Sequence, residues 1–403
     1  MALFIGRQPI LDHHTVTFGY ELLFRNGIKN TFEELDGDAA TSSVIDSGFL
    51  SLEFDAVTNG KKAFVNFTTA TLKEEYWRLL PRDKVVIEVL ETVEPDQEVI
   101  ESCQALKAAG YTLALDDFEY APAWDPLVDI ADIIKVDLGT ASMEQAEAYA
   151  KRYLPRNIRL LAEFIETLSD FKRTKEMGYS LFQGYFFAKP EVLESEQIST
   201  SKLAKLQLME KVNKPEIDYG ELNDILKGDP ALTVKLLKYV NSAALGVRYE
   251  VRAIRQALAL IGAQNLRKWI SILLMSTFSE DLPRELTRQA ITRGRFCELM
   301  AEEAGLAPQS TELFLTGIFS LMDAVFKRSM ETLLPDLPLS DDVKNTLLGE
   351  ATDYKPLLDL VRALENGSWK TVESFSAETG IAGQPIAQAF QESIAWTERF
   401  MLV

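Results

Sequence analysis

Apolar and polar residues follow different patterns in the two halves of this chain. In the first 190 residues, short β-like apolar runs alternate with helix-like segments. One such segment, DQEVIESCQALKAAG, has apolar residues every three or four positions and closes on Gly110. The β-like runs are FIGRQPIL, TVTFGYELLF, KKAFVNFT, KVVIEVLE, TLALDDF, IIKVD, IRLLAEFI and SLFQGYFF. This alternation predicts an α/β barrel with a mostly parallel sheet.

From about residue 200 onward, the β-like alternation disappears. The segments KLAKLQLMEKV, YGELNDILKG, DPALTVKLLKYVNSAALG, AIRQALALIG and LRKWISILLMSTF all have helical periodicity. Asp229 followed by Pro230 is typical of a helix start, and Gly246 and Gly262 are expected helix stops. We therefore expect an all-α domain over residues 203–403, joined to a barrel over residues 1–195 by the polar stretch 193–202.

Polar residues occupy a special place in the first half. Glu88, Asp116, Lys135 and Glu163 each lie at or just after the end of an apolar run. In a barrel, the carboxyl ends of the strands and the loops that follow them form the mouth, where active sites lie. The pattern predicts one shared site.

Composition narrows the chemistry of that site. The net charge of -19 argues against a nucleic-acid binder, because such proteins concentrate Lys and Arg. The two histidines, His13 and His14, are adjacent, which excludes dispersed histidine metal sites and serine-protease triads from the rest of the chain. Carboxylates must therefore carry the acid, base or metal chemistry.

The remaining composition bears on location. Cys103 and Cys297 lie far apart, which favours a reducing compartment over a disulfide framework. There is no secretory signal pattern and no apolar run of about 18 residues that would span a bilayer. We expect a soluble, cytoplasmic protein without a membrane partner.

A convergent set of oxygen ligands would explain the two adjacent carboxylates in LALDDFEYA. Carboxylate and amide oxygens suit Mg²⁺ or Mn²⁺, and two such cations can support phosphodiester hydrolysis. Asp117 would bridge the two metals, Lys135 would polarise the attacking water or stabilise the phosphorane charge, and Arg25 and Gln183 would contact substrate. The expected metal ligands are Glu21, Asn66, Glu88, Asp116, Asp117 and Glu163.

Each of these residues also has a structural interpretation. An acidic residue at a strand end is often a loop residue or a helix N-cap, and Lys135 could be a surface lysine or an ion-pair partner. The whole set favours a site more strongly than any one member does.

The first half of the sequence resembles the EAL domains, which hydrolyse or bind the bacterial second messenger cyclic di-GMP. The order of motifs is the same from about residue 5 to residue 190. The resembling segments are GRQPIL (YQPI), YELLFR (EALLR), FVNF, VIEVLET (LEITES), LDDF (DDFG), IIKVD (LKID), LLAEFIET (AEGVET) and FQGYFFAKP. The resemblance implies a TIM-like barrel with one reversed strand.

The resemblance also implies residue roles. The six expected metal ligands match the family's ligand positions, and Lys135 matches its catalytic lysine; with it, Glu21 and Glu163 are expected to be catalytic. Gln8, Arg25 and Gln183 match nucleotide contacts, and Glu91 matches a glutamate that steadies the loop after DDF.

The sequence departs from the family in three places. The family's glycine-containing loop FGTGYSSL, tied to metal binding and dimerisation, is here FEYAPAWDPL over residues 118–127, with Pro122 and Pro126 restricting it. Leu22 replaces the alanine of EAL and Phe164 the glycine of AEGVET, which we expect to narrow the pocket floor. These changes put catalytic efficiency in question without removing a ligand.

The second half resembles an HDOD domain through ILKGDPALTVKLLKYVNSAALG and AIRQALALIGAQNLRKW. That family is related to metal-dependent HD phosphohydrolases but lacks their histidines. No histidine follows His14 here, so an HD-type metal centre cannot form in this half. A signalling or partner-binding module is expected, with its protein partner unknown and a homodimer left open.

Two functional interpretations remain. In the first, the barrel is a weak or conditional phosphodiesterase that linearises cyclic di-GMP to pGpG with two divalent cations. In the second, it is a catalytically silent receptor or scaffold that acts through protein contacts. The retained ligand set favours the first and the altered loop favours the second; we lean to the enzyme.

Overall fold

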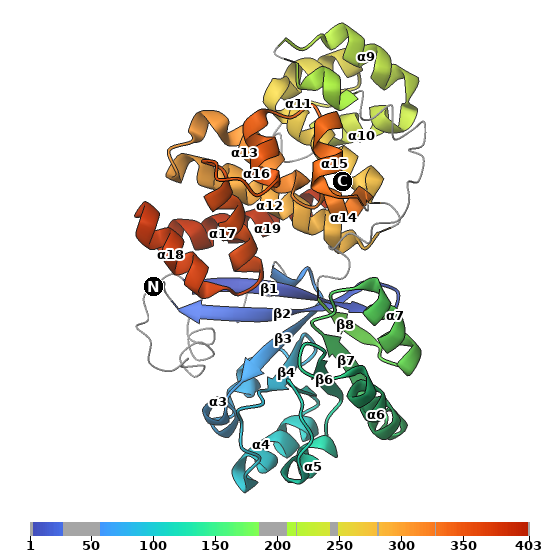
Figure 1. Ribbon diagram of the computed structural model, residues 1–403, viewed down its shortest axis with the longest axis vertical. Helices are drawn as coiled ribbons and strands as arrows, with labels where there is room; N and C mark the ends of the chain where they lie inside the picture. The colour runs from blue at the N-terminus through green and yellow to red at the C-terminus, as the bar shows by residue number, and fades with distance from the viewer. Residues whose placement is uncertain are drawn as a thin grey trace. The chain divides into compact units, whose positions relative to one another are not determined.

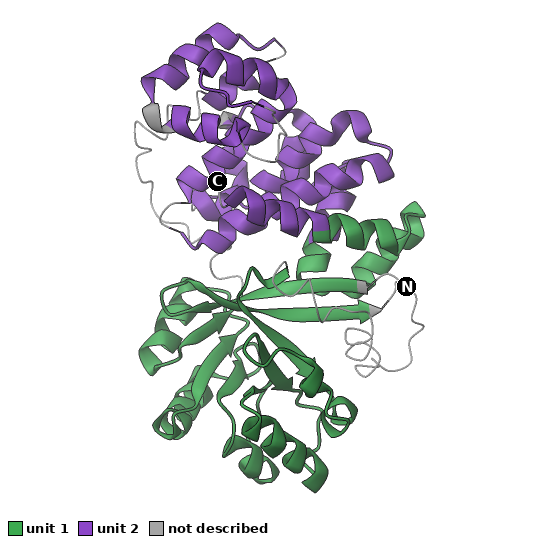
Figure 2. Cartoon of the chain, turned by 180° about the vertical axis from the view of Figure 1, so that it is seen from behind, with its two compact units in different colours: residues 1–189, 362–391 green, residues 190–361, 392–403 purple. Residues whose placement is uncertain are grey.

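The computed structural model describes residues 3–26, 57–184, 208–214, 216–241, 249–279, 282–326 and 328–401. The expected junction 193–202 and the expected helix stop at Gly246 lie outside these ranges. The chain forms two compact units, Met1–Lys189 with Arg362–Gln391, and Pro190–Val361 with Glu392–Val403 (Figure 2).

The first unit contains a closed barrel in which every strand pairs with its sequence neighbours (Figure 1). The strand β1 runs antiparallel to both β2 and β8, and all other neighbours are parallel. The strands are β1 (Leu3–Asp12), β2 (Thr17–Asn26), β3 (Lys62–Phe67), β4 (Val85–Val89), β5 (Thr112–Leu115), β6 (Ile133–Asp137), β7 (Arg159–Glu163) and β8 (Leu181–Gln183). Each expected run contributes one strand, and the reversed strand is confirmed.

Helices connect the parallel strands and surround the sheet (Figure 1). They are α3 (Thr69–Lys73), η1 (Tyr76–Leu79), α4 (Gln97–Ala108), η2 (Pro122–Trp124), α5 (Asp125–Val128), α6 (Met143–Tyr153), η3 (Leu154–Arg156) and α7 (Leu168–Met177). Asp96, Ser142 and Thr167 begin α4, α6 and α7, because their side-chain oxygens accept a backbone N–H of the first turn. The expected helix before Gly110 is thus confirmed as α4.

An apolar layer fills the barrel beneath its mouth. It is formed by Ile10, Phe64, Val86, Ala114, Ile133, Leu161 and Leu181, all of which are buried. Side chains two positions apart on a strand share a face. The next interior positions toward the carboxyl ends of β3 to β8 are Asn66, Glu88, Asp116, Lys135, Glu163 and Gln183. The strand period therefore places these polar residues together, one layer above an apolar floor.

The first unit also contains residues from the end of the chain. Helix α18 (Trp369–Thr379) and the residues before it pack on the paired strands β1 and β2. The rings of Phe4 and Trp369 lie 6.2 Å apart, and a side chain on Gly6 would meet the carbonyl oxygen of Leu364 at 2.7 Å. Residues 362–391 thus complete the unit that contains the barrel.

The second unit is helical, and the structure assigns no strand to its described residues. Asp229 caps the helix that begins at Pro230, since its carboxylate accepts the N–H of Leu232 at 3.1 Å. Gly262 breaks the helical backbone with φ 71° and ψ 163°, but a helix resumes directly after it, so the expected stop is a kink. Its helices are α9 (Tyr219–Gly228), α10 (Pro230–Val240), α11 (Ile254–Phe278), α12 (Arg284–Glu303), η4 (Ala307–Gln309), α13 (Ser310–Phe319), α14 (Met322–Phe326), α15 (Met330–Leu333), η5 (Leu334–Asp336) and α16 (Asp341–Leu347). Two further helices, α17 (Lys355–Glu365) and α19 (Gly383–Met401), belong to this unit only through residues 355–361 and 392–401.

Close packing of α12 on α13 forms part of the core of this unit. A Cβ added to Gly317 would lie 2.5 Å from the backbone of Arg293, so only glycine permits this approach. Across the described part of the chain, no helix combines the length and apolar character needed to cross a membrane.

Candidate active site

Lys135 lies at the centre of the barrel mouth and is surrounded by carboxylates. Its side chain comes from the middle of β6 and is 1% exposed. The distances from Lys135 Nζ are 2.6 Å to Asp116 Oδ1, 2.9 Å to Glu88 Oε1, 3.0 Å to Glu163 Oε1 and 3.4 Å to Glu21 Oε2. Four carboxyl groups thus share one ammonium group. Lys135 offsets the charge of Asp116, its nearest partner. The four carboxyl groups still outnumber the single ammonium group.

The environment sets the protonation of these groups. Burial raises the pKa of Glu88 and of Glu163 well above 4.5, although Lys135 opposes this shift. Burial also raises the pKa of Asp116. Burial opposes ionisation of Glu21 as well, but the Lys135 ammonium and hydrogen bonds from Gln183 and Asn66 lower its pKa below 4.5. Burial therefore makes Glu88, Asp116 and Glu163 harder to ionise than free carboxyl groups.

Lys135 itself stays charged. Burial alone would lower its pKa, but the surrounding carboxylates, with Asp116 the largest contributor, raise the pKa well above 10.5. A buried ammonium group with this many acidic partners holds their oxygens at the centre of the mouth. The structure thus brings the expected catalytic residues Lys135, Glu21 and Glu163 together.

Two amide side chains join this cluster. Asn66 Nδ2 donates to Glu21 Oε1 at 3.2 Å. Gln183 Nε2 donates to Glu21 Oε2 at 2.7 Å and to Gln8 Oε1 at 2.8 Å. The register explains the contacts, because Gln8 pairs with Glu21 across β1 and β2, and Asn66 pairs with Glu88 across β3 and β4. Gln8 and Gln183 therefore both lie beside the carboxylates.

Asp117 completes a group that could hold a cation. Carboxylate oxygens of Asp116, Asp117 and Glu163 lie within 4.8 Å of one another. Burial and the adjacent Asp116 raise the pKa of Asp117 to about 6. Its backbone has φ 39°, a left-handed conformation that Asp tolerates, so the chain turns sharply directly after Asp116. This turn lets two consecutive carboxylates face one place, which a continuous strand would not allow.

The donor set fits a divalent cation. Glu88 Oε2, Glu163 Oε2 and Gln183 Oε1 are buried and accept no hydrogen bond within the described part of the chain. Buried oxygens without a donor are rare in folded proteins, and hard cations such as Mg²⁺ and Mn²⁺ take oxygen ligands of this kind. The cluster therefore offers oxygens that the protein itself leaves unsatisfied.

Aromatic packing holds the altered loop 118–127. Phe118 is buried, and its ring lies 6.2 Å from that of Trp124, 6.0 Å from Tyr149 and 5.8 Å from Tyr153. The Arg152 guanidinium stacks 3.7 Å from the centre of the Tyr120 ring. Packing against α6 thus fixes this loop, in place of the glycine-containing loop of the resembling family.

Glu91 lies in the turn after β4 and is exposed. Its negative charge contributes to the raised pKa values of Asp116 and Asp117, so it lies close to both. Among the described residues it forms no hydrogen bond with loop 118–127. Its loop-stabilising role stays a prediction.

Arg25 has partners that sequence patterns could not predict. Its guanidinium forms an ion pair with Glu373 and lies 6.0 Å from the centre of the Trp369 ring. Both partners belong to α18, almost 350 positions away, and no motif links them to the barrel. Arg25 is thus held by a protein carboxylate near the end of β2, apart from the Lys135 cluster.

The two residues expected to narrow the pocket floor lie elsewhere. Leu22 is 1% exposed and alternates with Glu21 along β2, so it faces away from the carboxylates. Phe164 is 62% exposed and follows β7 directly, which places it at the rim. The floor consists instead of the apolar layer that contains Phe64 and Ile133.

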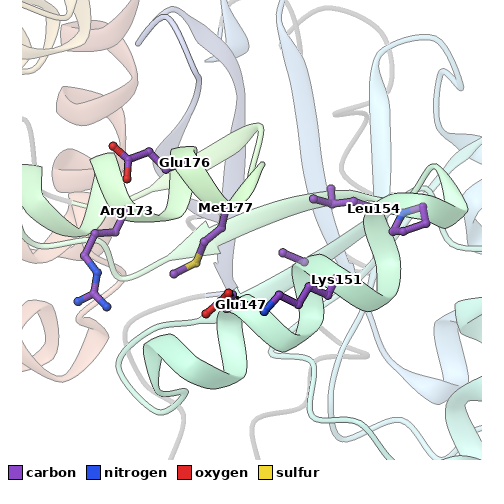
Figure 3. A pocket seen from close by; sticks show the side chains of 8 residues that line it. Glu147, Lys151, Leu154, Arg173, Glu176 and Met177 are labelled. Carbon is purple, nitrogen blue, oxygen red and sulfur yellow. Dashed lines mark ion pairs between the residues drawn. The ribbon is translucent and has the colours of Figure 1, made fainter.

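A hollow of about 550 Å³ opens on the outer side of the barrel, between α6 and α7 (Figure 3). Its lining combines charged and apolar side chains: Glu147, Ala150, Lys151, Leu154, Pro155, Arg173, Glu176 and Met177. None of them belongs to the carboxylate cluster. The candidate site is therefore the barrel mouth, not this hollow.

Comparison with known proteins agrees with this geometry. The chain matches the EAL domain over residues 33–190 and the HDOD domain over residues 201–330. It is 36% identical over 398 residues to the cyclic di-GMP phosphodiesterase CdgJ of Vibrio cholerae, covering 98% of this chain and 92% of the relative. It is 30% identical over 409 residues to the uncharacterised protein YuxH of Bacillus subtilis, covering 100% and 99% of the two chains.

Among solved structures, Klebsiella pneumoniae BlrP1 in its complex with calcium and cyclic di-GMP matches with a TM-score of 0.40 and 21% identity, over 47% of this chain and 56% of that one. A closed barrel with one reversed strand and an acidic mouth, followed by helices, defines an EAL-type barrel with a helical companion. The chain belongs to the family of proteins in which an EAL domain precedes an HDOD domain. The EAL match begins at residue 33, so Gln8, Glu21 and Arg25 precede it.

Proposed function

We propose that this protein takes part in bacterial cyclic di-GMP signalling in the cytoplasm. The barrel mouth binds cyclic di-GMP and hydrolyses it to pGpG, and the HDOD half regulates the site or binds a protein partner. The observation that carries the proposal is the buried cluster of Glu21, Glu88, Asp116 and Glu163 around Lys135, with Asp117 beside it. The relative CdgJ, named as a phosphodiesterase of this nucleotide, supports the substrate.

In this proposal, two cations, Mg²⁺ or Mn²⁺, are held by Glu21, Asn66, Glu88, Asp116, Asp117 and Glu163. When bound, they supply Lewis-acid stabilisation of the phosphodiester and a more acidic water. Hydrolysis adds one water: its oxygen bonds to phosphorus, and the bond from phosphorus to the ribose 3′ oxygen breaks. Lys135 holds the carboxylates in place and adds positive charge where the phosphoryl group becomes more negative.

The remaining residues of the mouth act on substrate and loop. Gln8, Gln183 and Arg25 contact the nucleotide, and Glu91 steadies the loop that follows Asp117. The neighbouring positions of Gln8 and Gln183, joined by a 2.8 Å hydrogen bond, support a common role. Arg25 has to leave Glu373 to reach a phosphate, which is consistent with weak or conditional activity.

A receptor or scaffold without turnover is the second candidate. It is favoured by the aromatic packing of loop 118–127 and by the pairing of Arg25 with Glu373. A receptor would bind cyclic di-GMP without forming product. A scaffold would neither bind the nucleotide nor form product.

The deciding experiment is incubation of purified protein with cyclic di-GMP and Mg²⁺ or Mn²⁺, followed by chromatography for pGpG and by calorimetric titration of the same sample. We expect product from the wild type and none from Glu21→Gln, which keeps the shape of the side chain. Glu176→Gln, an exposed residue of α7, is the matched control and should behave as wild type. Equal turnover by Glu21→Gln would refute the site.

We also propose the domain division at 1–195 and 203–403. The EAL and HDOD matches, which end at 190 and begin at 201, support it. Residues 362–391 pack in the barrel's unit, so the fragment 203–403 would expose Trp369. Circular dichroism of that fragment tests the division: a soluble helical spectrum is expected, and aggregation would place the boundary elsewhere. Light scattering of the full chain tests for a homodimer.

A further inference from the structure

Phe164 combines two features that are unfavourable for a folded chain. Its ring is 62% exposed, and its backbone has φ 51°, in the left-handed region. Of the described residues outside glycine with positive φ, the others are Thr15, Asn59, Glu75, Asp117 and Asn157, all polar. A bulky side chain in this conformation is strained, and strain of this kind gathers at functional sites. Glycine would remove both the strain and the exposed apolar surface.

Hydrogen bonds fix the place of Phe164 on both sides. Glu163, the residue before it, binds Lys135 at 3.0 Å and accepts the N–H of Leu138 at 3.3 Å through its backbone. Ile165, the residue after it, is buried and donates its N–H to the carbonyl oxygen of Gln183 at 3.1 Å. The Phe164 backbone is thus tied to two strand ends that carry residues of the candidate site.

Gly184 holds the same segment from the other side. A Cβ on Gly184 would lie 2.3 Å from the carbonyl oxygen and 2.5 Å from the nitrogen of Ile165. This close backbone approach leaves the 163–165 turn little room to relax. The ring of Phe164 therefore remains at the rim, one residue away from a carboxylate of the cluster.

We propose that Phe164 stacks on a guanine base of cyclic di-GMP and so strengthens nucleotide binding at this site. The proposal rests on the proposed function and extends it to a contact with the base. The carboxylate cluster can bind only the charged, metal-associated phosphodiester, and it carries no information about the bases. An exposed aromatic face at its rim supplies the complementary contact, because every base has a π-face that stacks on such a ring.

Three substitutions separate stacking from obstruction and from a structural role. Phe164→Gly removes the ring and the backbone strain; we expect a thermal midpoint about 2–4 °C higher and cyclic di-GMP binding about tenfold weaker. Phe164→Leu keeps an apolar side chain and the strained backbone but has no flat face, so binding should weaken by a similar factor. Phe164→Trp should bind as tightly as wild type.

The substituted tryptophan also gives a direct signal. Its fluorescence, taken as the difference from the wild type with its five native tryptophans, should be quenched when cyclic di-GMP binds. Leu79→Ala is the matched control, because Leu79 is 51% exposed but precedes β4 and so lies toward the amino ends of the strands, away from the mouth. It should leave both affinity and quenching unchanged.

Calorimetric titration of the full chain with cyclic di-GMP in Mn²⁺, over a time short relative to turnover, measures the affinities. Unchanged or tighter binding by Phe164→Gly, with a wild type that binds, would overturn the stacking proposal and identify Phe164 as neutral or obstructive. A wild type that shows neither binding nor hydrolysis would instead refute the proposed function. Equal affinity of Phe164→Leu and wild type would also overturn the proposal, since shape without a flat face would then suffice.

Discussion

The barrel mouth and the helical unit both bury charged side chains, but they compensate them differently. In the helical unit, Arg288 pairs with two carboxylates. Its Nη1 lies 2.6 Å from Glu285 Oε2, and its Nε lies 2.7 Å from Glu398 Oε1. A second such group lies in the same unit: Lys268 and Arg295 pair with Glu298, and Arg295 Nη2 lies 2.7 Å from Glu392 Oε1. Cations and anions there are nearly equal in number, whereas at the mouth four carboxyl groups share Lys135. Balanced charge needs no ligand, while an excess of buried acid calls for protons or cations.

Removal of Lys135 should have the largest effect on stability, because the mouth has one cation for four carboxyl groups. Lys135→Met takes away the ammonium group that the four carboxyl groups share, and we expect a loss of about 3–5 kcal/mol in the free energy of unfolding at pH 8. The loss should shrink at pH 5, where the carboxyl groups take up protons. Urea titration at the two pH values measures both. A cost below about 1 kcal/mol at pH 8 would show that the mouth does not depend on its central cation.

Divalent cations should stabilise the mouth more as the pH rises. Because the pKa values of Glu88 and Glu163 lie well above 4.5 in the folded protein, the stability they contribute is fully present below pH 4.5 and is lost as pH rises through the folded-state values. In the proposed function, Mn²⁺ would take the place of these protons. At one hundred times its dissociation constant it should add about 2.7 kcal/mol.

Thermal melts between pH 5 and pH 8, with Mn²⁺ or with EDTA, test this dependence. The shift produced by Mn²⁺ should grow with pH, and Glu21→Gln should reduce it. A shift that is constant with pH would mean that cation binding releases no protons from the cluster.

A charge removed from the helical unit should behave differently. Arg288→Ala leaves Glu285 and Glu398 without this partner, and we expect a loss of about 1–3 kcal/mol. Because the change lies outside the mouth, the stabilisation by Mn²⁺ should equal that of the wild type in the same thermal melts. A reduced response to Mn²⁺ would mean that the ion pairs of the helical unit affect cation binding at the mouth.

The smallest effect is expected at Arg25. Glu373→Gln removes the carboxylate that holds Arg25, and a partly exposed ion pair of this kind contributes little. Cyclic di-GMP binding should tighten by up to about fivefold, as measured by calorimetry. Glu378→Gln, an exposed position of the same helix, is the control. Weaker binding by Glu373→Gln would mean that Glu373 supports the site instead of competing for Arg25.

The fold was predictable where one local pattern decided it. Each apolar run became a strand because strands of a barrel need buried alternate positions, and the place of Glu88, Asp116, Lys135 and Glu163 at strand ends indicated the mouth. Sequence spacing says nothing about distances between strands. It therefore could not reveal that Lys135 contacts four carboxyl groups at once.

Other features depended on tertiary contacts or on backbone conformation. The pairing of Arg25 with Glu373 joins positions that share no pattern. The expected narrowing by Leu22 failed because the strand period turns this residue away from Glu21. The left-handed backbone of Phe164 has no sequence signal except the absence of the glycine found in the resembling family. Gly262 was expected to end a helix, yet the chain continues as a helix after one non-helical residue.

The two-residue step between the apolar layer and the site residues has a consequence for folding accuracy. A slip of one residue in β4 would turn Glu88 outward and bring Ile87 or Val89 into the mouth. The same holds for β6 and β7, whose site residues also sit between apolar neighbours. If the mouth binds cations as proposed, that binding requires correct strand pairing around the whole ring, and a misregistered chain should not respond to Mn²⁺.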